Sequence, residues 1–301
     1  MRLPERAEVR PAAARPLTAA ALEHRALPAP GQDKEDRGRV CVVGGSAQVP
    51  GAALLAGEAA LRAGAGKLQI ATVRSVAAGL GLAVPEALVL GLQEDEDGEM
   101  AAGDAALEAA LENCGAIVVG PGMRSTPFLA AFVERAATAR ATVVLDAGAL
   151  TGHVRAAAAA PFVLTPHAGE MAEICATSKE AVQQAPVEHA QRIAAQTRSV
   201  VILKGPLTHI VGDDGQVWLH QGGVPGLGTS GSGDVLAGLI AGFAARGARP
   251  LDAALWGVWV HGEAGRLLAQ SVGSLGFLAR ELSAEVPRIL DRFALRPDPT
   301  R

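Results

Sequence analysis

The sequence predicts an α/β fold in which helices cover both faces of a mostly parallel central sheet. Two observations carry this prediction. Short apolar runs recur along the chain, and most are continuously apolar rather than alternating, as in strands that are buried on both faces. Alanine-rich segments with helical spacing separate these runs, which is the order expected when helices connect parallel strands.

The composition predicts the character of the N-terminal segment, and the apolar runs predict the strands that follow. Residues 1–38 are rich in proline, alanine and charge, so we expect a loosely ordered extension with one short helix. A regular pattern begins at Arg39. Thr208–Val211 and Gln216–Leu219 flank the turn residues Asp213-Asp214-Gly215, which predicts an antiparallel hairpin. The other expected strands are Val40–Val43, Lys67–Ala71, Ala87–Leu90, Ala116–Val119, Thr142–Leu145, Phe162–Leu164 and Val200–Leu203.

Helices are expected between these strands and throughout the last third of the chain, from Gly231 onward. The clearest earlier helical patterns are Gly51–Ala63, Asp104–Glu112 and Thr126–Ala139. The acidic stretch Glu94–Glu99 is predicted to be a solvated loop, and Ala156–Ala160 a helical segment or a linker. We therefore expect one domain over residues 39–295, followed by a short tail over residues 296–301.

The composition narrows the classes of partner. The 301 residues carry a net charge of −4 and form no basic block, which disfavours a nucleic acid or another polyanion. Aromatic residues make up only 3% of the chain and tyrosine is absent, so recognition of bases by stacked aromatic rings is also disfavoured. The high content of glycine (36 residues) and alanine indicates a core of small, closely packed side chains.

Neither cysteine spacing nor targeting signals point to an oxidising compartment or a membrane. Cys41, Cys114 and Cys175 are far apart and form no CxxC pair, so a disulfide framework and a zinc site are poorly supported. The N-terminal residues lack the apolar segment of a signal peptide. The longest apolar run, Val235–Ala245, is too short to cross a bilayer. We expect a cytoplasmic protein with no membrane partner.

Glycine and polar residues follow five of the expected strands. They are Gly44-Gly45-Ser46, Gly120-Pro121-Gly122, Asp146, Thr165-Pro166-His167 and Lys204-Gly205. The carboxyl ends of parallel strands lie at one edge of the sheet, where ligands of such folds bind. A glycine after one strand is an ordinary turn, but all five clusters together predict a single ligand crevice.

The densest glycine-rich segment, residues 222–233, leads into the apolar helix pattern that starts near Asp234. Glycines let backbone N–H groups approach a ligand closely, and a helix N-terminus adds its positive dipole end. This combination predicts a phosphate-binding anion hole. Asp234 could simply complement the helix dipole, but beside bound phosphate it could also take a proton from a substrate hydroxyl. The chain lacks the patterns GxxxxGK[ST] and GxGxxG, so we expect a nucleotide site of another architecture.

Taken in order, these motifs resemble the ribokinase-like superfamily and, more narrowly, the ADP-dependent NAD(P)H-hydrate dehydratase family. Leu145–Leu150 is similar to the family's LDADAL motif, and Thr165–Glu170 matches its TPHxGE motif. Lys204–Thr208 matches its KGxxT segment, and residues 223–238 resemble its GNPGMATGGTGDVLAG motif. The resemblance extends from about Arg39 to Leu282 and implies a ribokinase-like catalytic domain.

The resemblance implies repair of the hydrated nicotinamide ring of NAD(P)H. ADP, or ATP in eukaryotic relatives, would phosphorylate the ring hydroxyl, and loss of phosphate would restore NAD(P)H. By carry-over, Asp234 is the catalytic base, and Glu170 holds a water of Mg²⁺. The other implied contacts with the hydrate are Ala52, Gly122, His167 and Asp234. Those with the AMP part of the nucleotide are Lys204, Gly205, Pro206, Leu207, Thr208 and Gly233. The backbone N–H groups of Gly231, Ser232 and Gly233 would stabilise the phosphoryl group in transfer.

The chain departs from the family motifs at a few positions. Gly148 stands at the second Asp of LDADAL, Val224 at the Asn of GNPG, and Ser230 and Ser232 at Gly and Thr. The substitutions at Gly148 and Val224 remove polar groups, which bears on how the substrate is oriented. The family also has a His-Gly pair at His261, for which packing beside Trp256 and Trp259 is the simpler interpretation. The remaining histidines, including His220, are expected to be structural or exposed.

Two other functions remain open from the sequence. The first is an ATP-dependent kinase of the same superfamily that acts on a vitamin precursor or a sugar, and the second is a non-catalytic nucleotide-binding paralogue. Relatives are often homo-oligomeric, so we expect a homo-oligomer, with a tetramer as one form. Only 38 residues precede the motifs, so we expect the epimerase activity of bifunctional relatives to reside in a separate protein.

Overall fold

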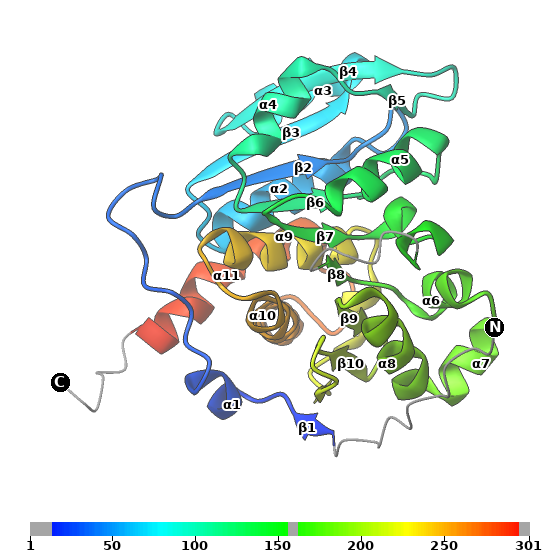
Figure 1. The fold of residues 1–301 in the computed structure, drawn as a ribbon. Helices are drawn as coiled ribbons and strands as arrows, with labels where there is room; N and C mark the ends of the chain where they lie inside the picture. Colours follow the sequence, from blue (N-terminus) through cyan, green and yellow to red (C-terminus); the bar gives the residue numbers. More distant parts are fainter. Residues whose placement is uncertain (1–13, 156–161, 295–301) are drawn as a thin grey trace.

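A computed structural model describes residues 14–155 and 162–294. Its strands form one eleven-stranded sheet in the order β1-β11-β10-β9-β8-β7-β6-β2-β3-β4-β5 (Figure 1). The strands are β1 (Arg15–Pro16), β2 (Arg39–Val43), β3 (Lys67–Val73), β4 (Ala87–Glu94), β5 (Met100–Ala102), β6 (Ala116–Val119), β7 (Thr142–Leu145), β8 (Phe162–Leu164), β9 (Val200–Leu203), β10 (Thr208–Val211) and β11 (Val217–His220).

Helices connect most neighbouring strands of the sheet. The α-helices are α1 (Ala19–Glu23), α2 (Gly51–Arg62), α3 (Arg74–Ala83), α4 (Ala105–Glu112), α5 (Pro127–Ala136), α6 (Ala168–Cys175), α7 (Lys179–Gln184), α8 (Pro186–Thr197), α9 (Ser232–Ala245), α10 (Pro250–Ser271) and α11 (Ala279–Ala294). Three short 3₁₀ helices are described as well: η1 (Ala147–Ala149), η2 (Gly152–Arg155) and η3 (Pro225–Gly228).

The predicted mostly parallel sheet is confirmed. The pairs from β4 through β3, β2, β6, β7 and β8 to β9 are all parallel. The pairing of β10 with β9 and with β11 is antiparallel, as the hairpin prediction requires, and β5 is antiparallel to β4. Several strands coincide with their predicted bounds because each is a short, continuously apolar run.

Two hydrophobic clusters lie on opposite faces of the sheet, so helices cover both faces as predicted. One face packs against α2, α9, α10 and α11, with Val42 and Val118 among its buried residues. The other face packs against α4, α5, α6 and α8, with Ile117 and Val119. Helices α2 and α9 lie very close together, since a Cβ atom on Gly238 would meet the carbonyl oxygen of Ala56 at 2.0 Å. At the start of α9, a Cβ atom on Gly231 would lie 2.5 Å from Leu55 Cδ1, so the N-terminus of α9 also contacts α2.

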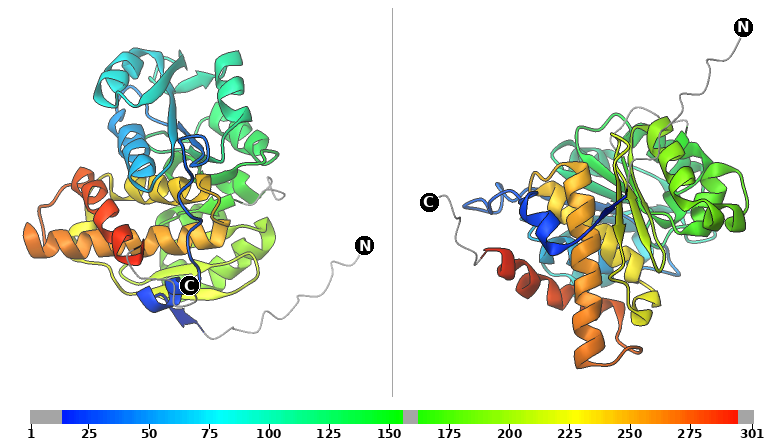
Figure 2. Two further views of the ribbon diagram at one scale, coloured as in Figure 1. Left: turned by 90° about the vertical axis from the view of Figure 1, so that its left-hand side faces the viewer. Right: turned by 90° about the horizontal axis from the view of Figure 1, so that it is seen from below.

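The prediction of a loosely ordered extension is wrong for residues 14–38, although its short helix is confirmed as α1. Strand β1 pairs in parallel with β11, and Leu22 is fully buried in the core. The indole N–H of Trp256 donates to the carbonyl oxygen of Arg25 at 2.7 Å, and the Arg25 guanidinium pairs with Asp252. Figure 2 shows this segment lying along α10. The partners of β1 and Arg25 are more than 200 residues away, so local composition could not predict the order of this segment.

The acidic stretch also differs from the prediction. Glu94 ends β4, and the Glu99 side chain is buried and accepts hydrogen bonds from the backbone N–H and Nε of Arg124. Only the turn between these residues is a solvated loop. The segment Ala156–Ala160 and the tail 296–301 lie outside the described residues.

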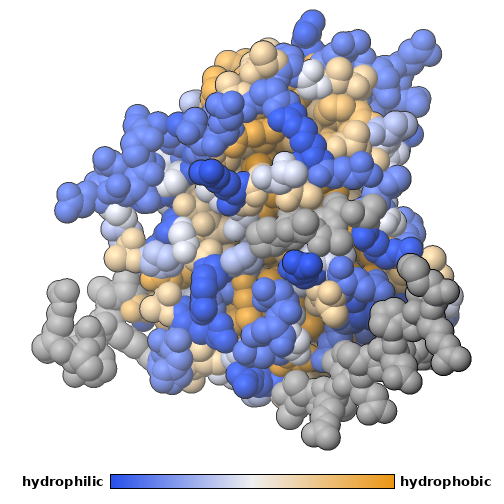
Figure 3. Space-filling model, in the orientation of Figure 1, coloured by the Kyte–Doolittle hydropathy of each residue, from blue (hydrophilic) through white to orange (hydrophobic). Residues whose placement is uncertain are grey.

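On the face seen in Figure 3, hydrophilic side chains cover most of the surface, and apolar atoms show between them. Within residues 14–155 and 162–294, no helix is both long enough and apolar enough to cross a membrane.

Candidate active site

The five strand ends that were predicted to form one crevice are contiguous in the structure. They follow β2, β6, β7, β8 and β9, which are neighbours in the sheet. The backbone N–H of Gly45 donates to the carbonyl oxygen of Pro121 at 2.7 Å, and that of Lys204 donates to Pro166 at 2.8 Å. The glycine and polar clusters therefore face one another along a single edge of the sheet.

A buried group of charges lies at the ends of β7, β8 and β9. The Asp146 carboxylate is only 3% exposed and accepts hydrogen bonds from Thr165 Oγ1 at 2.6 Å and from Lys204 Nζ at 3.0 Å. Glu170 Oε2 lies 3.8 Å from the same ammonium. The two carboxylates raise the pKa of Lys204 above its usual value despite burial, so this cation persists at neutral pH.

His167 and Glu170 form a reciprocal cap on α6. His167 Nδ1 accepts hydrogen bonds from the backbone N–H groups of Gly169 and Glu170, both at 3.0 Å. Glu170 Oε2 in turn accepts the backbone N–H of His167 at 2.7 Å. An Nδ1 atom that accepts two hydrogen bonds carries no proton, so the proton of the neutral ring is on Nε2. The exposed edge of His167 can therefore act as a hydrogen-bond donor.

Helix α9 begins directly after the glycine-rich segment. Gly231, its N-cap, has φ +88°, a left-handed conformation that glycine adopts without strain. Within the described chain, the backbone N–H groups of Gly231 and Gly233 have no acceptor, whereas that of Ser232 donates to Thr229 at 3.3 Å. A Cβ atom on Gly233 would lie 3.4 Å from Lys204 Nζ, which places the helix start beside the buried charges. Free N–H groups and a nearby ammonium form an anion-binding corner.

Asp234 lies in the first turn of α9, next to this corner. Burial and the neighbouring Asp146 carboxylate raise its pKa to about 7, although Lys204 acts in the opposite direction. A carboxyl group with a pKa near neutrality can both accept and release a proton under physiological conditions. This property suits Asp234 to acid–base chemistry.

A pocket of about 690 Å³ extends from the anion-binding corner along α9 and α10. Among the residues predicted to contact the nucleotide or substrate, those that line this pocket are His167, Lys204, Gly205, Pro206, Thr208, Ser232 and Gly233. Leu207 and Gly231 belong to the adjoining segments but do not line it. Val224, Leu227 and Val258 give its far end an apolar wall, which is the character expected for the site of a flat heterocycle.

The predicted substrate residues on the β2 and β6 side form a separate wall of the crevice. A Cβ atom on Gly122 would lie 2.7 Å from Ala52 Cβ. Ala52 is buried one turn before Leu55 on α2, and Leu55 reaches the space beside Gly231. The structure thus connects Ala52 and Gly122 to the start of α9 through α2.

Comparison with known proteins decides the family. Residues 40–288 match the sequence profile described as NAD(P)H-hydrate dehydratase. The chain belongs to the NAD(P)H-hydrate dehydratase family. The ADP-dependent (S)-NAD(P)H-hydrate dehydratase of Xanthomonas campestris pv. campestris is 62% identical over 279 residues, which cover 92% of this chain and 96% of that protein.

Solved structures agree with this membership. The ADP/ATP-dependent NAD(P)H-hydrate dehydratase of Bacillus subtilis, co-crystallised with ATP and Mg²⁺, aligns with a TM-score of 0.79 at 31% identity and covers 93% of this chain and 99% of that chain. A ribokinase-like superfamily protein from Enterococcus faecalis V583 aligns with a TM-score of 0.79 at 27% identity, covering 93% and 96%. The predicted ribokinase-like fold is therefore confirmed.

The structure explains one departure from the dehydratase family motifs. Gly148 stands at the second Asp of LDADAL, and a Cβ atom there would lie 2.3 Å from the carbonyl oxygen of Met123. The backbone of Met123 and Arg124 therefore fills the space of a side chain at position 148. Glu99 fixes this loop through its two hydrogen bonds to Arg124. No contact in the described structure explains the substitution at Val224.

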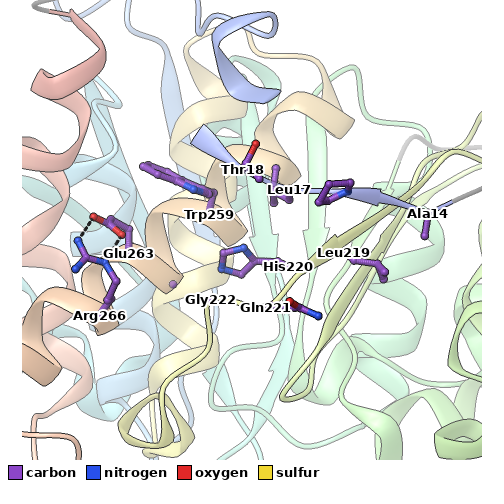
Figure 4. A pocket seen from close by; sticks show the side chains of 12 residues that line it. Ala14, Leu17, Thr18, Leu219, His220, Gln221, Gly222, Trp259, Glu263 and Arg266 are labelled. Atoms are coloured by element: carbon purple, nitrogen blue, oxygen red, sulfur yellow. Dashed lines mark hydrogen bonds and ion pairs between the residues drawn. The ribbon is translucent and has the colours of Figure 1, made fainter. Parts of the chain in front are cut away.

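Two histidines of this dehydratase-family chain were missed as site neighbours. His261 bonds to Ser232 and lines the pocket. His220 is buried between Gly222 and Gly262 and also borders a second pocket of about 420 Å³ (Figure 4). Its two ring nitrogens have no hydrogen-bond partner among the described residues, and burial lowers its pKa. Sequence spacing gave no signal for His220, because its neighbours come from other elements, and the one signal for His261 was the His-Gly pair of the family, which we interpreted as packing.

Proposed function

We propose that the protein dehydrates the hydrate of NAD(P)H, in its S form, back to NAD(P)H at the expense of ADP, releasing AMP and phosphate. The observation that carries the proposal is the position of Asp234. It is a carboxyl group with a pKa of about 7 in the first turn of a helix whose N-terminus, beside a buried ammonium, forms an anion-binding corner. The chain that holds this arrangement belongs to the NAD(P)H-hydrate dehydratase family.

Asp234 acts as the general base in the first step. It takes the proton of the ring hydroxyl, whose oxygen forms a bond to the β-phosphorus of ADP while the bond from that phosphorus to the oxygen of AMP breaks. In the second step the carbon–oxygen bond of the phosphorylated hydrate breaks and phosphate departs. Loss of a proton from the neighbouring ring carbon then restores the double bond of NAD(P)H.

The anion-binding corner stabilises the charge that moves during phosphoryl transfer. Gly231 and Gly233 offer backbone N–H groups that have no acceptor elsewhere in the described chain. Donors fixed in advance at the place where charge develops lower the barrier without reorganisation. Lys204 adds a positive charge at this end of the pocket, although the family motif alone assigned it to the AMP part. Gly205, Pro206, Leu207 and Thr208 form the segment that holds the rest of the nucleotide.

The substrate hydrate binds on the opposite side of Asp234. Ala52 and Gly122 form a close-packed wall of small residues, which suits a flat ring. His167 can donate through Nε2 to an oxygen of the hydrate because its Nδ1 is committed to the cap of α6.

Mg²⁺ is the cation that we expect to accompany the nucleotide. The described residues contain no cluster of three or more His, Cys, Asp or Glu side chains that could form a dedicated metal site. Glu170 is half-buried, with one oxygen committed to the His167 N–H and an ammonium 3.8 Å from that oxygen. Such a carboxylate fits contact through a water, which Mg²⁺ readily retains. When bound, Mg²⁺ would neutralise charge on the phosphates.

The proposal also covers the cellular location, the oligomeric state and the partner enzyme of the protein. We propose a cytoplasmic homo-oligomer, with a tetramer as one form, that acts beside a separate epimerase. The epimerase would supply the S form of the hydrate from its R form. Neither a nucleic acid nor a membrane is needed for the reaction.

The proposal is tested by incubating the protein with NADH hydrate, Mg²⁺ and either ADP or ATP, and following the recovery of NADH absorbance. Recovery with release of AMP and phosphate is expected with ADP. A phosphorylated product that accumulates without recovery of NADH would favour the small-molecule kinase. Nucleotide binding without any turnover would favour a non-catalytic paralogue.

A further inference from the structure

A histidine of α10 reaches the first residue of α9. His261 Nε2 lies 2.9 Å from the hydroxyl oxygen of Ser232 and 3.1 Å from the Ser232 carbonyl oxygen. Both residues line the nucleotide pocket. Among the described side chains, only His261 forms a hydrogen bond with the Ser232 hydroxyl, so this bond sets the orientation of the hydroxyl.

The two distances determine where the proton of the imidazole is. A carbonyl oxygen can only accept a hydrogen bond, so the contact at 3.1 Å requires a proton on Nε2. Burial lowers the pKa of His261 to about 4, helped by the positive charge of Lys204, so the ring is neutral at pH 7 and Nδ1 carries no proton. His261 is thus held as a single tautomer that donates from Nε2.

The tautomer fixes the role of the serine hydroxyl. Because His261 Nε2 is the donor, Ser232 Oγ accepts, and the hydroxyl proton has no acceptor elsewhere in the described chain. The backbone N–H of Ser232 is already committed to Thr229. Ser232 can therefore serve a bound anion through its hydroxyl rather than through its backbone, unlike Gly231 and Gly233 on either side.

We propose that the Ser232 hydroxyl is a catalytic hydrogen-bond donor to the phosphoryl group in transfer, and that His261 is the positioning residue that directs it. The inference rests on the proposed phosphoryl transfer from ADP; it adds His261 to that step and assigns the contact of Ser232 to its hydroxyl. A hydrogen bond from a neutral donor to a charged oxygen is stronger than one between neutral groups. The small side chain at position 232 and the histidine of the following helix act as one unit.

The test compares single and paired variants in the recovery of NADH. We expect Ser232→Ala and His261→Phe each to lower kcat about 10- to 100-fold, with the KM for the hydrate unchanged within about threefold. Ser232→Thr, which keeps the hydroxyl, should retain activity within about threefold. His261→Gln should recover part of the loss seen in His261→Phe, because its amide N–H can donate to the same oxygens.

The double variant shows whether His261 acts through Ser232 or contributes to kcat independently of it. If His261 acts through Ser232, the combination of Ser232→Ala and His261→Phe is no worse than Ser232→Ala alone. His153→Gln, at an exposed position outside the pocket, is the matched control and should leave kcat unchanged. Losses that multiply in the double variant, or a Ser232→Ala enzyme with full kcat, would overturn the proposal.

A binding measurement keeps this test independent of the reaction assigned above. AMP with aluminium fluoride and Mg²⁺ mimics the phosphoryl group in transfer and needs no hydrate. Ser232→Ala should bind this mimic about tenfold more weakly than the native protein, while binding AMP alone equally well. Native protein that fails to recover NADH would refute the dehydratase function, whereas equal binding of the mimic by both proteins would refute the role of Ser232.

Discussion

The two sides of the crevice are built on different principles. At the ends of β7, β8 and β9, the side chains of Asp146, Lys204 and Glu170 are buried charges joined by ion pairs. At the ends of β2 and β6, the loops contain glycine and meet through backbone contacts such as Gly45 with Pro121. One side therefore depends on which charges are present, and the other on how closely two backbones approach. Substitutions should lower activity sharply on the first side and act mainly through shape on the second.

The difference also explains which family motifs are retained. The charged residues Asp146, Glu170 and Asp234 all stand where the motifs require them. A charge that is lost from a buried network leaves its partner uncompensated, which costs several kcal/mol. Gly148 follows β7 on the charged side, but it departs from the motif at a point of close backbone packing, where the Met123–Arg124 loop that follows β6 occupies the space of a side chain.

The largest loss of activity is expected for Asp234→Asn. Without a base, kcat should fall about 10³-fold or more, whereas binding of ADP should change little. The pKa of the wild-type carboxyl group is raised from 3.8 to about 7 by folding, so the unfolded chain loses this proton first, and the group destabilises the fold increasingly from about pH 4 to pH 7 and by a constant amount above. The variant should therefore be more stable than wild type at pH 8, by roughly 2–4 kcal/mol, and this gain should fall to about half at pH 5.5.

Thermal unfolding at the two pH values checks the Asp234→Asn prediction together with the activity assay. The same pKa predicts that wild-type activity declines as the pH falls through about 7, because Asp234 becomes protonated. A variant that retains turnover would show that Asp234 is not the base, and equal stability at pH 8 would show that its ionisation costs nothing.

A smaller loss of kcat is expected for Lys204→Met, which tests whether the charged side of the crevice takes part in the chemistry. Removal of the ammonium leaves Asp146 with Thr165 as its side-chain partner and takes a positive charge away from Asp234. We expect kcat to fall about 10- to 100-fold, and the acidic limb of the pH profile of kcat/KM to move to higher pH. Lys204→Arg, which keeps the charge, is the matched control. A rise in the KM for ADP alone, with kcat and the pH profile unchanged, would instead limit Lys204 to nucleotide binding.

The smallest effect on the chemistry is expected for Gly148→Asp, which restores the family residue at the contact between the loop after β7 and the loop after β6. Its Cβ atom would clash with the Met123 carbonyl, so the loop must shift, and we expect a loss of about 1–3 kcal/mol in the free energy of unfolding. Activity should fall less than tenfold. Gly152→Asp is the control, since nothing lies within 4 Å of a Cβ atom there. A Gly148→Asp protein as stable as this control would show that the loop is not tightly packed.

The sequence predicted those parts of the fold that depend on local pattern. Continuous apolar runs located most strands of the sheet, and the polar clusters after β7, β8 and β9 located the charged side of the site. Strand β5 was missed because its three residues, Met100 to Ala102, include no β-branched or aromatic side chain, and α3 because Gly79 and Gly81 weaken its helical pattern.

The parts that escaped prediction depend on contacts between distant segments. The link between His261 and Ser232 joins residues 29 positions apart on two helices, so no spacing rule identifies it. The raised pKa of Asp234 likewise depends on Asp146, which follows a different strand. In the same way, the buried carboxylate of Glu99 is explained by Arg124 rather than by its acidic neighbours.

The pairing of β1 with β11 constrains how the chain folds during synthesis. Arg15 lies opposite Trp218, and the guanidinium of Arg25 stacks over the same indole at 5.1 Å from the ring centroid. Strand β1 emerges from the ribosome early but has no partner until about 200 further residues have been made. Closure of the sheet at this edge is therefore a late event, and the N-terminal segment must remain unpaired through most of translation.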